Sequence, residues 1–200
     1  MIVSEISSIE SFVQKVSSEV FRDFCDGMGI MFDIDIRWTG QEMSTAKFDS
    51  LKEQFNKQAA MYSIEAKGRI DGTFYLVLDH PGVFTLPGII VMHPKKRIEE
   101  NCRKGTDDEV TPILDAVKEL GNLLVGSWQK IVQQQLADNT HLLQTGTYAG
   151  SLSDIPEDWC KIPADEEFTF MPFEITVGDY SPFVCGVMVS SSLLSVTPES

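Results

Sequence analysis

The spacing of apolar residues in the first forty positions predicts a helix followed by a strand. In residues 8–25 apolar side chains recur every three or four positions, which is the period of an amphipathic helix. Two glycines, Gly27 and Gly29, are expected to end it. Residues 30–38 then alternate between apolar and polar, as a strand with one solvent-exposed side does.

The next part of the chain predicts a β-hairpin. Residues 62–70 and 73–79 have strand character, and Asp71-Gly72 between them suits a tight turn. Before the hairpin, residues 46–60 predict a short charged helix. Two neighbouring antiparallel strands are therefore expected near the middle of the fold.

Proline and glycine interrupt the apolar stretch that follows the hairpin. Residues 83–92 are mostly apolar, but Pro87-Gly88 falls inside them. Because proline lacks a backbone N–H, we expect a broken helix packed on the sheet. Residues 94–104 predict a second helical piece.

A long helix follows, and the sequence offers two starting points for it. Thr106-Asp-Asp-Glu109 has the pattern of a capping box, whereas Thr111-Pro112 has the pattern of an N-cap followed by proline in the first turn. We favour Thr111, because proline within a helix that began at Thr106 would remove a hydrogen bond. The helix is expected to run to about Leu136 and to be the central element of the fold.

The C-terminal part of the chain predicts further strands. Residues 141–166 are rich in Gly, Ser, Asp and Pro and predict a long surface connection, while residues 168–177 and 183–190 have strand character. The expected fold class is α+β: a mostly antiparallel sheet packed against the long helix and the N-terminal helix. Residues 1–190 are expected to form a single domain and residues 191–200 a flexible tail.

The long helix carries a narrow polar face opposite its apolar one. Asp115, Glu119 and Asn122 are spaced i, i+4 and i+7, so at about 100° per residue they lie within roughly 60° of one another, and Gly126 follows on the same line. The opposite, apolar face is formed by Ile113, Val117, Leu120, Leu124, Trp128 and Ile131. The carboxylates and the amide are therefore expected to point into solvent.

The composition of this polar face favours a functional interpretation over an ordinary solvated surface. Asn122 is a mediocre helix former, and Gly121 and Gly126 each cost about 1 kcal/mol relative to Ala inside a helix. The two glycines are expected to leave a flat patch from which Glu119 and Asn122 project toward a partner protein. Local rules broken on one face of an element are typical of a functional site.

These residues resemble a known signature. Asp-x-x-x-Glu-x-x-Asn on a long helix, followed by Leu-Leu-x-Gly, resembles the signature of the CheC/CheX family of chemotaxis phosphatases, and the N-terminal helix and the hairpin match as well. The resemblance implies that Glu119 reaches an active-site lysine of a phosphorylated CheY-like receiver domain, that Asn122 orients the attacking water, and that Asp115 supports them. Gly121, Gly126 and Lys118 on the same helix are expected to contact the partner.

The resemblance implies an enzyme, a hydrolase of the receiver's aspartyl phosphate. An acyl phosphate is already reactive, so placing a water in line is the main task. We expect no cofactor bound by this chain, with Mg²⁺ in the receiver partner. The N-terminal helix has Arg22 three positions after Glu19, where a second motif would need asparagine, so the single motif is CheX-like and a homodimer is possible. The alternative is a non-enzymatic receiver-binding or flagellar-switch-like adaptor.

Charge and cysteine usage narrow the remaining possibilities. A formal net charge of −14 repels phosphate backbones and argues against a nucleic-acid partner. The sequence has neither a targeting signal nor an apolar run long enough for a membrane helix, so we expect a cytoplasmic bacterial protein. The cysteines at positions 25, 102, 160 and 185 are widely scattered and are expected to be reduced thiols, not metal ligands.

Overall fold

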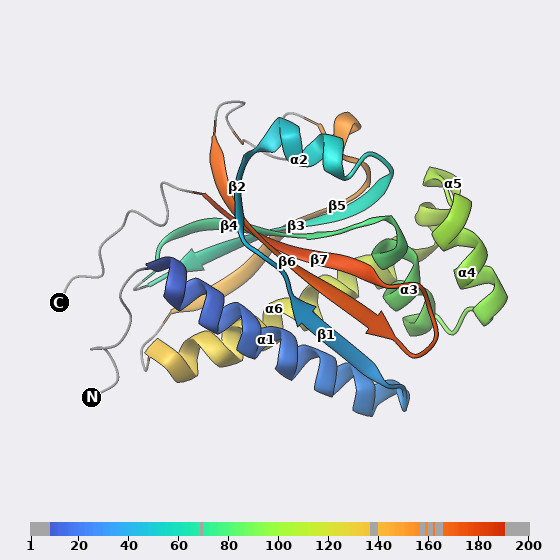
Figure 1. Ribbon diagram of the computed structural model, residues 1–200, viewed down its shortest axis with the longest axis horizontal. Coiled ribbons are helices and arrows are strands. Elements are labelled where there is room, and N and C mark those ends of the chain that lie inside the picture. Colours follow the sequence, from blue (N-terminus) through green and yellow to red (C-terminus); the bar gives the residue numbers. More distant parts are fainter. Residues whose placement is uncertain are drawn as a thin grey trace.

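The core of the fold is an antiparallel β-sheet. The computed structural model describes residues 9–68, 70–136, 140–156, 159, 162 and 166–190. Within them seven strands form one sheet in the order β1-β6-β7-β4-β3-β5, and β2 also pairs with β6 (Figure 1). The strands are β1 (Ile36–Gly40), β2 (Ser44–Lys47), β3 (Gln58–Lys67), β4 (Gly72–Leu78), β5 (His141–Ser151), β6 (Glu167–Val177) and β7 (Phe183–Ser190).

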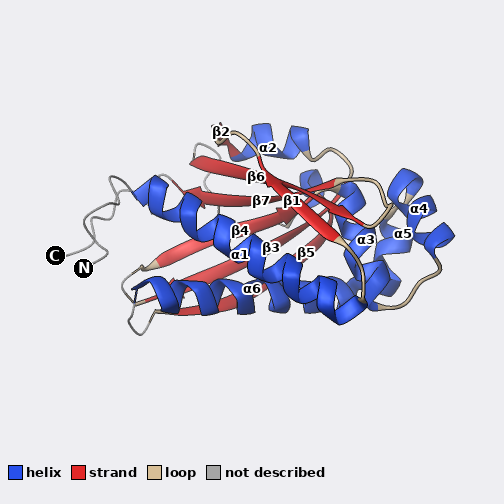
Figure 2. Ribbon diagram, turned by 60° about the horizontal axis from the view of Figure 1, so that its bottom comes forward, coloured by secondary structure: helices blue, strands red, loops and turns tan. Residues whose placement is uncertain are grey.

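Helices cover both faces of this sheet. Figure 2 shows α1 and α6 running across one face, whereas α2 lies on the other, and α3, α4 and α5 gather at one end of the sheet (Figure 1). The helices are α1 (Ile9–Phe32), α2 (Phe48–Gln54), α3 (His80–Ile90), α4 (Lys95–Lys104), α5 (Asp107–Val110) and α6 (Leu114–Leu136), with short 3₁₀ turns η1 (Thr111–Ile113) and η2 (Leu152–Asp154). The predicted α+β fold class is confirmed.

The sheet separates two hydrophobic cores. The larger lies between the sheet and the layer formed by α1, α3 and α6, and the smaller lies under α2. In the larger core the ring of Phe21 stacks on Phe173 of β6 with centroids 4.1 Å apart. Full burial of one such side chain stabilises the fold by about 1.5–3 kcal/mol. The strands β4, β6 and β7 are buried along most of their length, because helices cover both faces of the sheet.

The predicted hairpin is present, with a longer turn than expected. β3 and β4 pair antiparallel, as predicted. Gly72, however, already pairs with Ala66, so the connection is longer than a two-residue Asp71-Gly72 turn. Gly72 has φ 141°, a conformation that glycine adopts far more readily than other residues.

The N-terminal helix is longer than its glycines suggested. α1 continues through Gly27 and Gly29 to Phe32, and the expected strand is reduced to β1. Gly29 is part of the actual stop signal: its carbonyl accepts the N–H of Ile34 at 3.1 Å, while Asp33 adopts φ 51°. This is a Schellman-type ending, placed one turn later than the glycine positions indicated.

Two other helical predictions were partly correct. The segment 46–60 contains a helix, α2, but β2 ends and β3 begins within the same stretch. The predicted break at Pro87 does not occur, because α3 runs through this proline to Ile90. Buried apolar side chains of α3, such as Phe84 and Leu86, anchor the helix on the sheet just before the missing N–H of Pro87. α4 was correctly predicted.

The predicted surface connection 141–166 was wrong over its first half. Residues 141–151 form β5, which pairs with β3 along its whole length. β5 is an edge strand, so it gains hydrogen bonds on one side only and tolerates Gln, Thr and Gly, which give little strand signal. The strands near the C-terminus, β6 and β7, were predicted correctly, and the tail 191–200 lies outside the described residues.

None of the helices in the described part of the chain is both long enough and apolar enough to cross a membrane.

Candidate functional site

The long helix that carries the polar face is introduced by a capping box. The carboxylate of Glu109 accepts hydrogen bonds from the backbone N–H of Thr106 at 2.7 Å and from its hydroxyl at 2.8 Å. Thr111, which we had expected to be the N-cap, instead has helical φ and ψ, and its hydroxyl donates to the carbonyl of Asp107. The chain passes Pro112 as a 3₁₀ turn and continues directly into α6.

The start at Thr106 was therefore the correct alternative. A 3₁₀ turn uses i to i+3 bonds, so it absorbs the missing N–H of Pro112 at little cost. The short α5 and the turn act as a lead-in that orients α6 before Asp115. As a result, Asp115, the first acidic residue of the polar face, lies about two turns inside a continuous helical run instead of at its beginning.

The polar side chains on α6 lie where the sequence indicated. Asp115, Lys118, Glu119, Asn122 and Gly126 are all exposed to solvent. The apolar positions of the helix face the sheet and α1, and they include Val117, Leu120, Leu124 and Trp128. The helix therefore holds an acid and an amide on one rigid, solvent-facing surface.

Two hydrogen bonds organise this surface. The side-chain amide of Asn122 donates through Nδ2 to Oε2 of Glu119 at 3.3 Å, and Nζ of Lys118 donates to Oδ1 of Asp115, also at 3.3 Å. Both are bonds between exposed groups, and such interactions contribute only about 0–1 kcal/mol. A partner protein can therefore replace them with its own groups at small cost.

Gly121 does not belong to the exposed patch, contrary to our expectation. It is buried, and a Cβ at this position would lie 2.5 Å from Cδ1 of Tyr62 and 2.6 Å from Oε1 of Gln144. Glycine is required here because an aromatic ring from the sheet occupies the space. The sequence pattern correctly identified Gly121 as unusual, but the residue lies on the buried face of the helix and not on the exposed one.

Gly126 lies in the open, as expected. Nothing approaches within 4 Å of the position that its Cβ would take. No contact within the described residues thus explains the choice of glycine over alanine, which would favour the helix by about 1 kcal/mol. Because Gly126 has no side chain, the helix surface is flat one turn beyond Asn122.

A buried carboxylate elsewhere in the fold has a structural explanation. Asp79 caps α3 by accepting the N–H of Gly82 at 3.0 Å, and it also accepts the N–H of Val184 at 2.9 Å. Burial raises the pKa of Asp79 to about 6, although these two backbone bonds lower it. The carboxylate is buried where it joins α3 to β7, and this burial accounts for its raised pKa.

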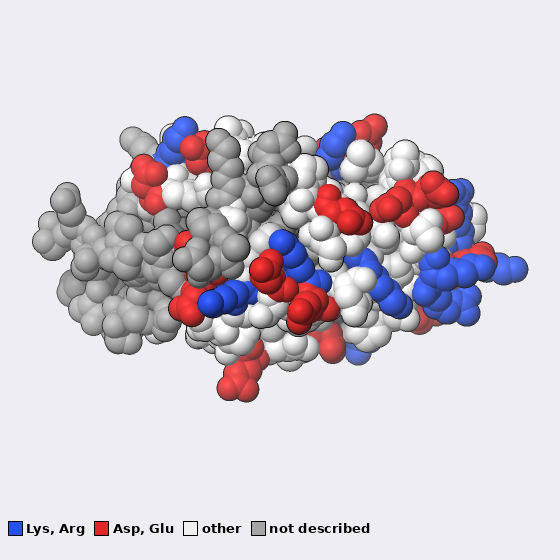
Figure 3. Space-filling view, turned by 90° about the horizontal axis from the view of Figure 1, so that it is seen from above, with Lys and Arg blue, Asp and Glu red and all other residues white. Residues whose placement is uncertain are grey.

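Positive charge gathers away from α6. In Figure 3, Lys and Arg side chains cluster at the α4 end of the molecule, whereas acidic side chains are spread over the visible face. The exposed cations of α4 are Lys95, Lys96, Arg97, Arg103 and Lys104. Lys95 is engaged in an ion pair with Asp179. A strongly acidic chain thus keeps a local basic region on α4.

The polar face has the groups needed to hold and orient water. An asparagine amide presents a donor and an acceptor in one plane, and a nearby carboxylate presents acceptors for a cationic partner group. Across the part of the chain that the structure covers, no cluster of three or more His, Cys, Asp or Glu side chains could hold a metal ion. The polar face of α6 is therefore suited to a reaction in which a partner protein supplies the electrophilic group.

Comparison with solved structures identifies the fold. It is similar to that of FliY from Thermotoga maritima, with a TM-score of 0.73, 17% identity, and coverage of 97% of this chain and 94% of that chain. The FliM middle domain from H. pylori matches with a TM-score of 0.70, 10% identity, and coverage of 94% and 96%. No protein-family model and no curated protein sequence matches this chain.

Chemotaxis protein CheX from Vibrio vulnificus is also among the similar structures, with a TM-score of 0.49, 12% identity, and coverage of 86% of this chain and 95% of that chain. FliY and the FliM middle domain share the CheC-like fold, so their likeness to this chain confirms the predicted CheC/CheX-like fold. At these identities the likeness establishes the fold alone.

Proposed function

We propose that the exposed face of α6 binds a phosphorylated CheY-like receiver domain and accelerates hydrolysis of its aspartyl phosphate. The observation that carries this proposal is the placement of Glu119 and Asn122. Both side chains are exposed on one helix, and Nδ2 of Asn122 lies 3.3 Å from Oε2 of Glu119. An acid and an amide that project from one exposed helix face can enter the active site of another protein.

In the proposed mechanism Asn122 orients the attacking water. With Nδ2 turned toward Glu119, the Oδ1 atom of the amide is directed away from that carboxylate and can accept a hydrogen bond from water. The water oxygen attacks phosphorus, the bond between phosphorus and the aspartyl oxygen breaks, and the products are inorganic phosphate and the free receiver carboxylate. The leaving carboxylate needs no proton.

Glu119 supplies the docking interaction. Its carboxylate can exchange the weak bond to Asn122 for a charge-assisted bond to a lysine of the receiver, which is roughly twice as strong as a neutral one. The receiver contributes Mg²⁺, which neutralises charge on the phosphoryl oxygens. Asp115 and Lys118 pair with each other one turn earlier and keep that part of the face in place.

The proposal is tested by mixing the purified chain with phosphorylated receivers from the same organism. We expect a substoichiometric amount of the chain to accelerate phosphate release, because a positioned water replaces a randomly oriented one. The measurement is the first-order loss of aspartyl phosphate with and without the chain. A receiver that binds tightly yet loses phosphate at its intrinsic rate would contradict the enzymatic proposal.

A second candidate is a non-enzymatic adaptor. The observation that favours it is the type of structural neighbour: FliM from H. pylori has been crystallised in complex with FliG and in complex with SpeE. A chain with this fold could likewise act by binding another protein. In that case the α6 face would serve as a contact surface, and the assay above would detect binding without a change in the rate of phosphate release.

A further inference from the structure

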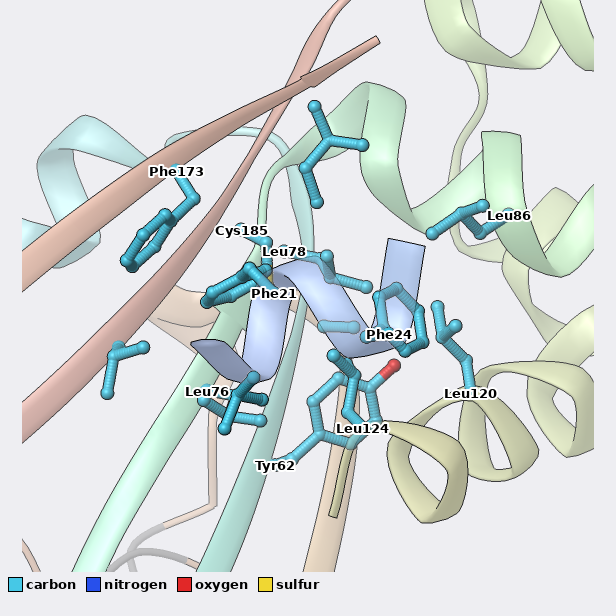
Figure 4. Close-up of a cluster of buried hydrophobic side chains, with 14 of the residues drawn as sticks. Phe21, Phe24, Tyr62, Leu76, Leu78, Leu86, Leu120, Leu124, Phe173 and Cys185 are labelled. Atoms are coloured by element: carbon cyan, nitrogen blue, oxygen red, sulfur yellow. The ribbon is translucent and has the colours of Figure 1, made fainter. Parts of the chain in front are cut away.

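Tyr62 of β3 forms a buried contact with the helix that carries the polar face. Its side chain is completely buried, and its hydroxyl donates to the backbone carbonyl of Val117 at 2.9 Å. Burial raises the pKa of this hydroxyl well above its usual value, so it keeps its proton and acts as a donor. In the close-up of the core, the hydroxyl oxygen of Tyr62 points toward α6, near Leu120 and Leu124 (Figure 4).

The same tyrosine also fills the space under Gly121. Atoms Cδ1 and Cε1 of its ring would lie 2.5 Å and 2.6 Å from a Cβ added to Gly121, and Oε1 of Gln144 would also lie 2.6 Å away. Real Cβ atoms do not approach other atoms so closely. The backbone of α6 therefore rests directly on the ring of Tyr62 at this turn.

The two contacts together restrict rotation of α6 about its own axis. Val117 and Gly121 are four residues apart and hence lie on one side of the helix, one turn above the other. Glu119 and Asn122 face away from that side. The hydrogen bond and the ring contact thus set both the distance of the helix from the sheet and the direction in which the polar face points.

The orientation of Asn122 depends strongly on that rotation. Its amide lies roughly 6 Å from the helix axis, so a rotation of about 10° would move it by about 1 Å. A misplacement of about 1 Å can lower the rate of a positioned reaction by about 10²-fold. Docking through the long, flexible side chain of Glu119 is less sensitive to such a displacement.

We propose that Tyr62 is a positioning residue for the α6 face: through Val117 and Gly121 it fixes the rotation of the helix that aims Asn122 at the water. This inference rests on the proposed phosphatase function. Gly121 is accordingly the residue that lets the tyrosine reach the helix backbone, and it need not contact the receiver. A core tyrosine with a purely structural role would affect activity only through the fraction of folded protein.

The test uses a size exchange between the two residues. Gly121→Ala adds a methyl group against the ring and should lower kcat about tenfold or more while changing KM less than threefold. The double variant Gly121→Ala with Tyr62→Leu removes the obstructing ring and should recover kcat to within about threefold of the wild type. The milder Tyr62→Phe keeps the ring, loses the hydrogen bond and should lower kcat about threefold.

The matched control is Phe21→Leu in α1. Phe21 is buried against the same sheet and stacks on Phe173, so its truncation disturbs the core at a ring contact with β6 that involves neither Tyr62 nor Gly121. We expect kcat per folded molecule to be unchanged in this variant. An equal loss in Phe21→Leu and Gly121→Ala, or no recovery in the double variant, would overturn the proposal.

A second measurement separates this proposal from the proposed function. Residual dipolar couplings of the α6 amides report the orientation of the helix relative to the sheet, whether or not the chain is a phosphatase. We expect the couplings to change in Gly121→Ala and to return toward wild-type values in the double variant. Unchanged couplings in Gly121→Ala would overturn the positioning role, whereas an inactive wild type with changed couplings would refute only the phosphatase function.

Discussion

The two helices that cross the same face of the sheet, α1 and α6, follow one pattern with different chemistry. On α6 the residues at i, i+4 and i+7 are Asp115, Glu119 and Asn122, and on α1 the same spacing holds Lys15, Glu19 and Arg22. Their buried positions also correspond, from Val16 and Ala116 to Met28 and Trp128. The two helices therefore share one pattern of buried positions but expose different polar side chains to solvent.

The difference lies in what each glutamate is bonded to. On α1 the carboxylate of Glu19 accepts a hydrogen bond from Gln135 of α6 at 2.7 Å, which fastens the two helices together. On α6 the carboxylate of Glu119 accepts a bond from Asn122 of the same helix. A residue type at a given spacing thus becomes a structural link on one helix and a presented functional group on the other.

The helices also differ in how they meet the sheet. α1 inserts its own aromatic side chain, Phe21, whereas the corresponding residue of α6 is Gly121, and the aromatic ring comes from Tyr62 of the sheet. The helix proposed to carry the chemistry is therefore contacted at its backbone by a ring of the sheet, whereas α1 reaches the sheet with a ring of its own.

The sharpest test of this comparison is removal of the amide. In Asn122→Ala we expect phosphate release to fall by about 10²-fold, since the water loses its orienting acceptor. The matched variant Arg22→Ala on α1 should leave the rate unchanged. Because Asn122 is exposed, the free energy of unfolding should stay within about 0.5 kcal/mol of the wild type, as measured by urea denaturation. Equal rates in the two variants would remove the distinction between the helices.

Truncation of the two glutamates should separate binding from stability. Glu119→Ala is expected to weaken receiver binding by about 2 kcal/mol, roughly thirtyfold in Kd, because it removes a charged docking group. Glu19→Ala should leave Kd unchanged and lower the free energy of unfolding by about 1 kcal/mol through loss of the bond to Gln135. Titration calorimetry would measure Kd, and denaturation would measure the free energy of unfolding. Weaker binding in Glu19→Ala with unchanged binding in Glu119→Ala would contradict the docking role of Glu119.

Exposed glycines on the two helices provide a third pair. At Gly126 of α6 and Gly27 of α1 there is open space around the missing Cβ, so alanine should stabilise the fold by about 1 kcal/mol at each. Gly126→Ala should also weaken receiver binding by roughly 1 kcal/mol, about fivefold in Kd, if the methyl group holds the partner away. Gly27→Ala should not affect binding. Stabilisation at both sites with unchanged binding would show that the receiver does not press on Gly126.

The smallest expected effect concerns the exposed lysines. Lys118→Gln should lower the association rate with the receiver about two- to threefold at low salt, and the difference should vanish at high salt because the charge is then screened. Lys15→Gln on α1 should have no effect. Stopped-flow measurements at two ionic strengths would decide the matter; a salt-independent loss would indicate a direct contact instead of long-range attraction.

The sequence was most informative where a long periodic pattern decided the structure. The regular apolar positions of α6 placed Asp115, Glu119 and Asn122 on one exposed face, because a helix of this length leaves few alternatives. The strands β6 and β7 were equally well predicted, since their buried faces repeat over many residues. Such elements are determined mainly by local periodicity.

The errors arose where a distant residue decided the structure. Gly121 was placed on the partner surface because nothing in the neighbouring sequence reveals the ring of Tyr62, which lies across the core. β5 was missed because its strand character comes from pairing with β3 and not from its own composition. The start of α6 was misjudged for a different reason, since the 3₁₀ turn at Pro112 accommodates a residue that normally breaks helices.

The pairing of β1 with β6 has a consequence for synthesis of the protein on the ribosome. Ile36 pairs with Val177, so 141 residues (177 − 36) must be added before the first strand meets its neighbour. At about 5–20 residues per second, translation of that stretch takes roughly 7–28 s. During this interval the nascent amino-terminal segment lacks the β6 surface on which Phe21 will stack. The apolar face of this segment is then accessible to chaperones and to other nascent chains.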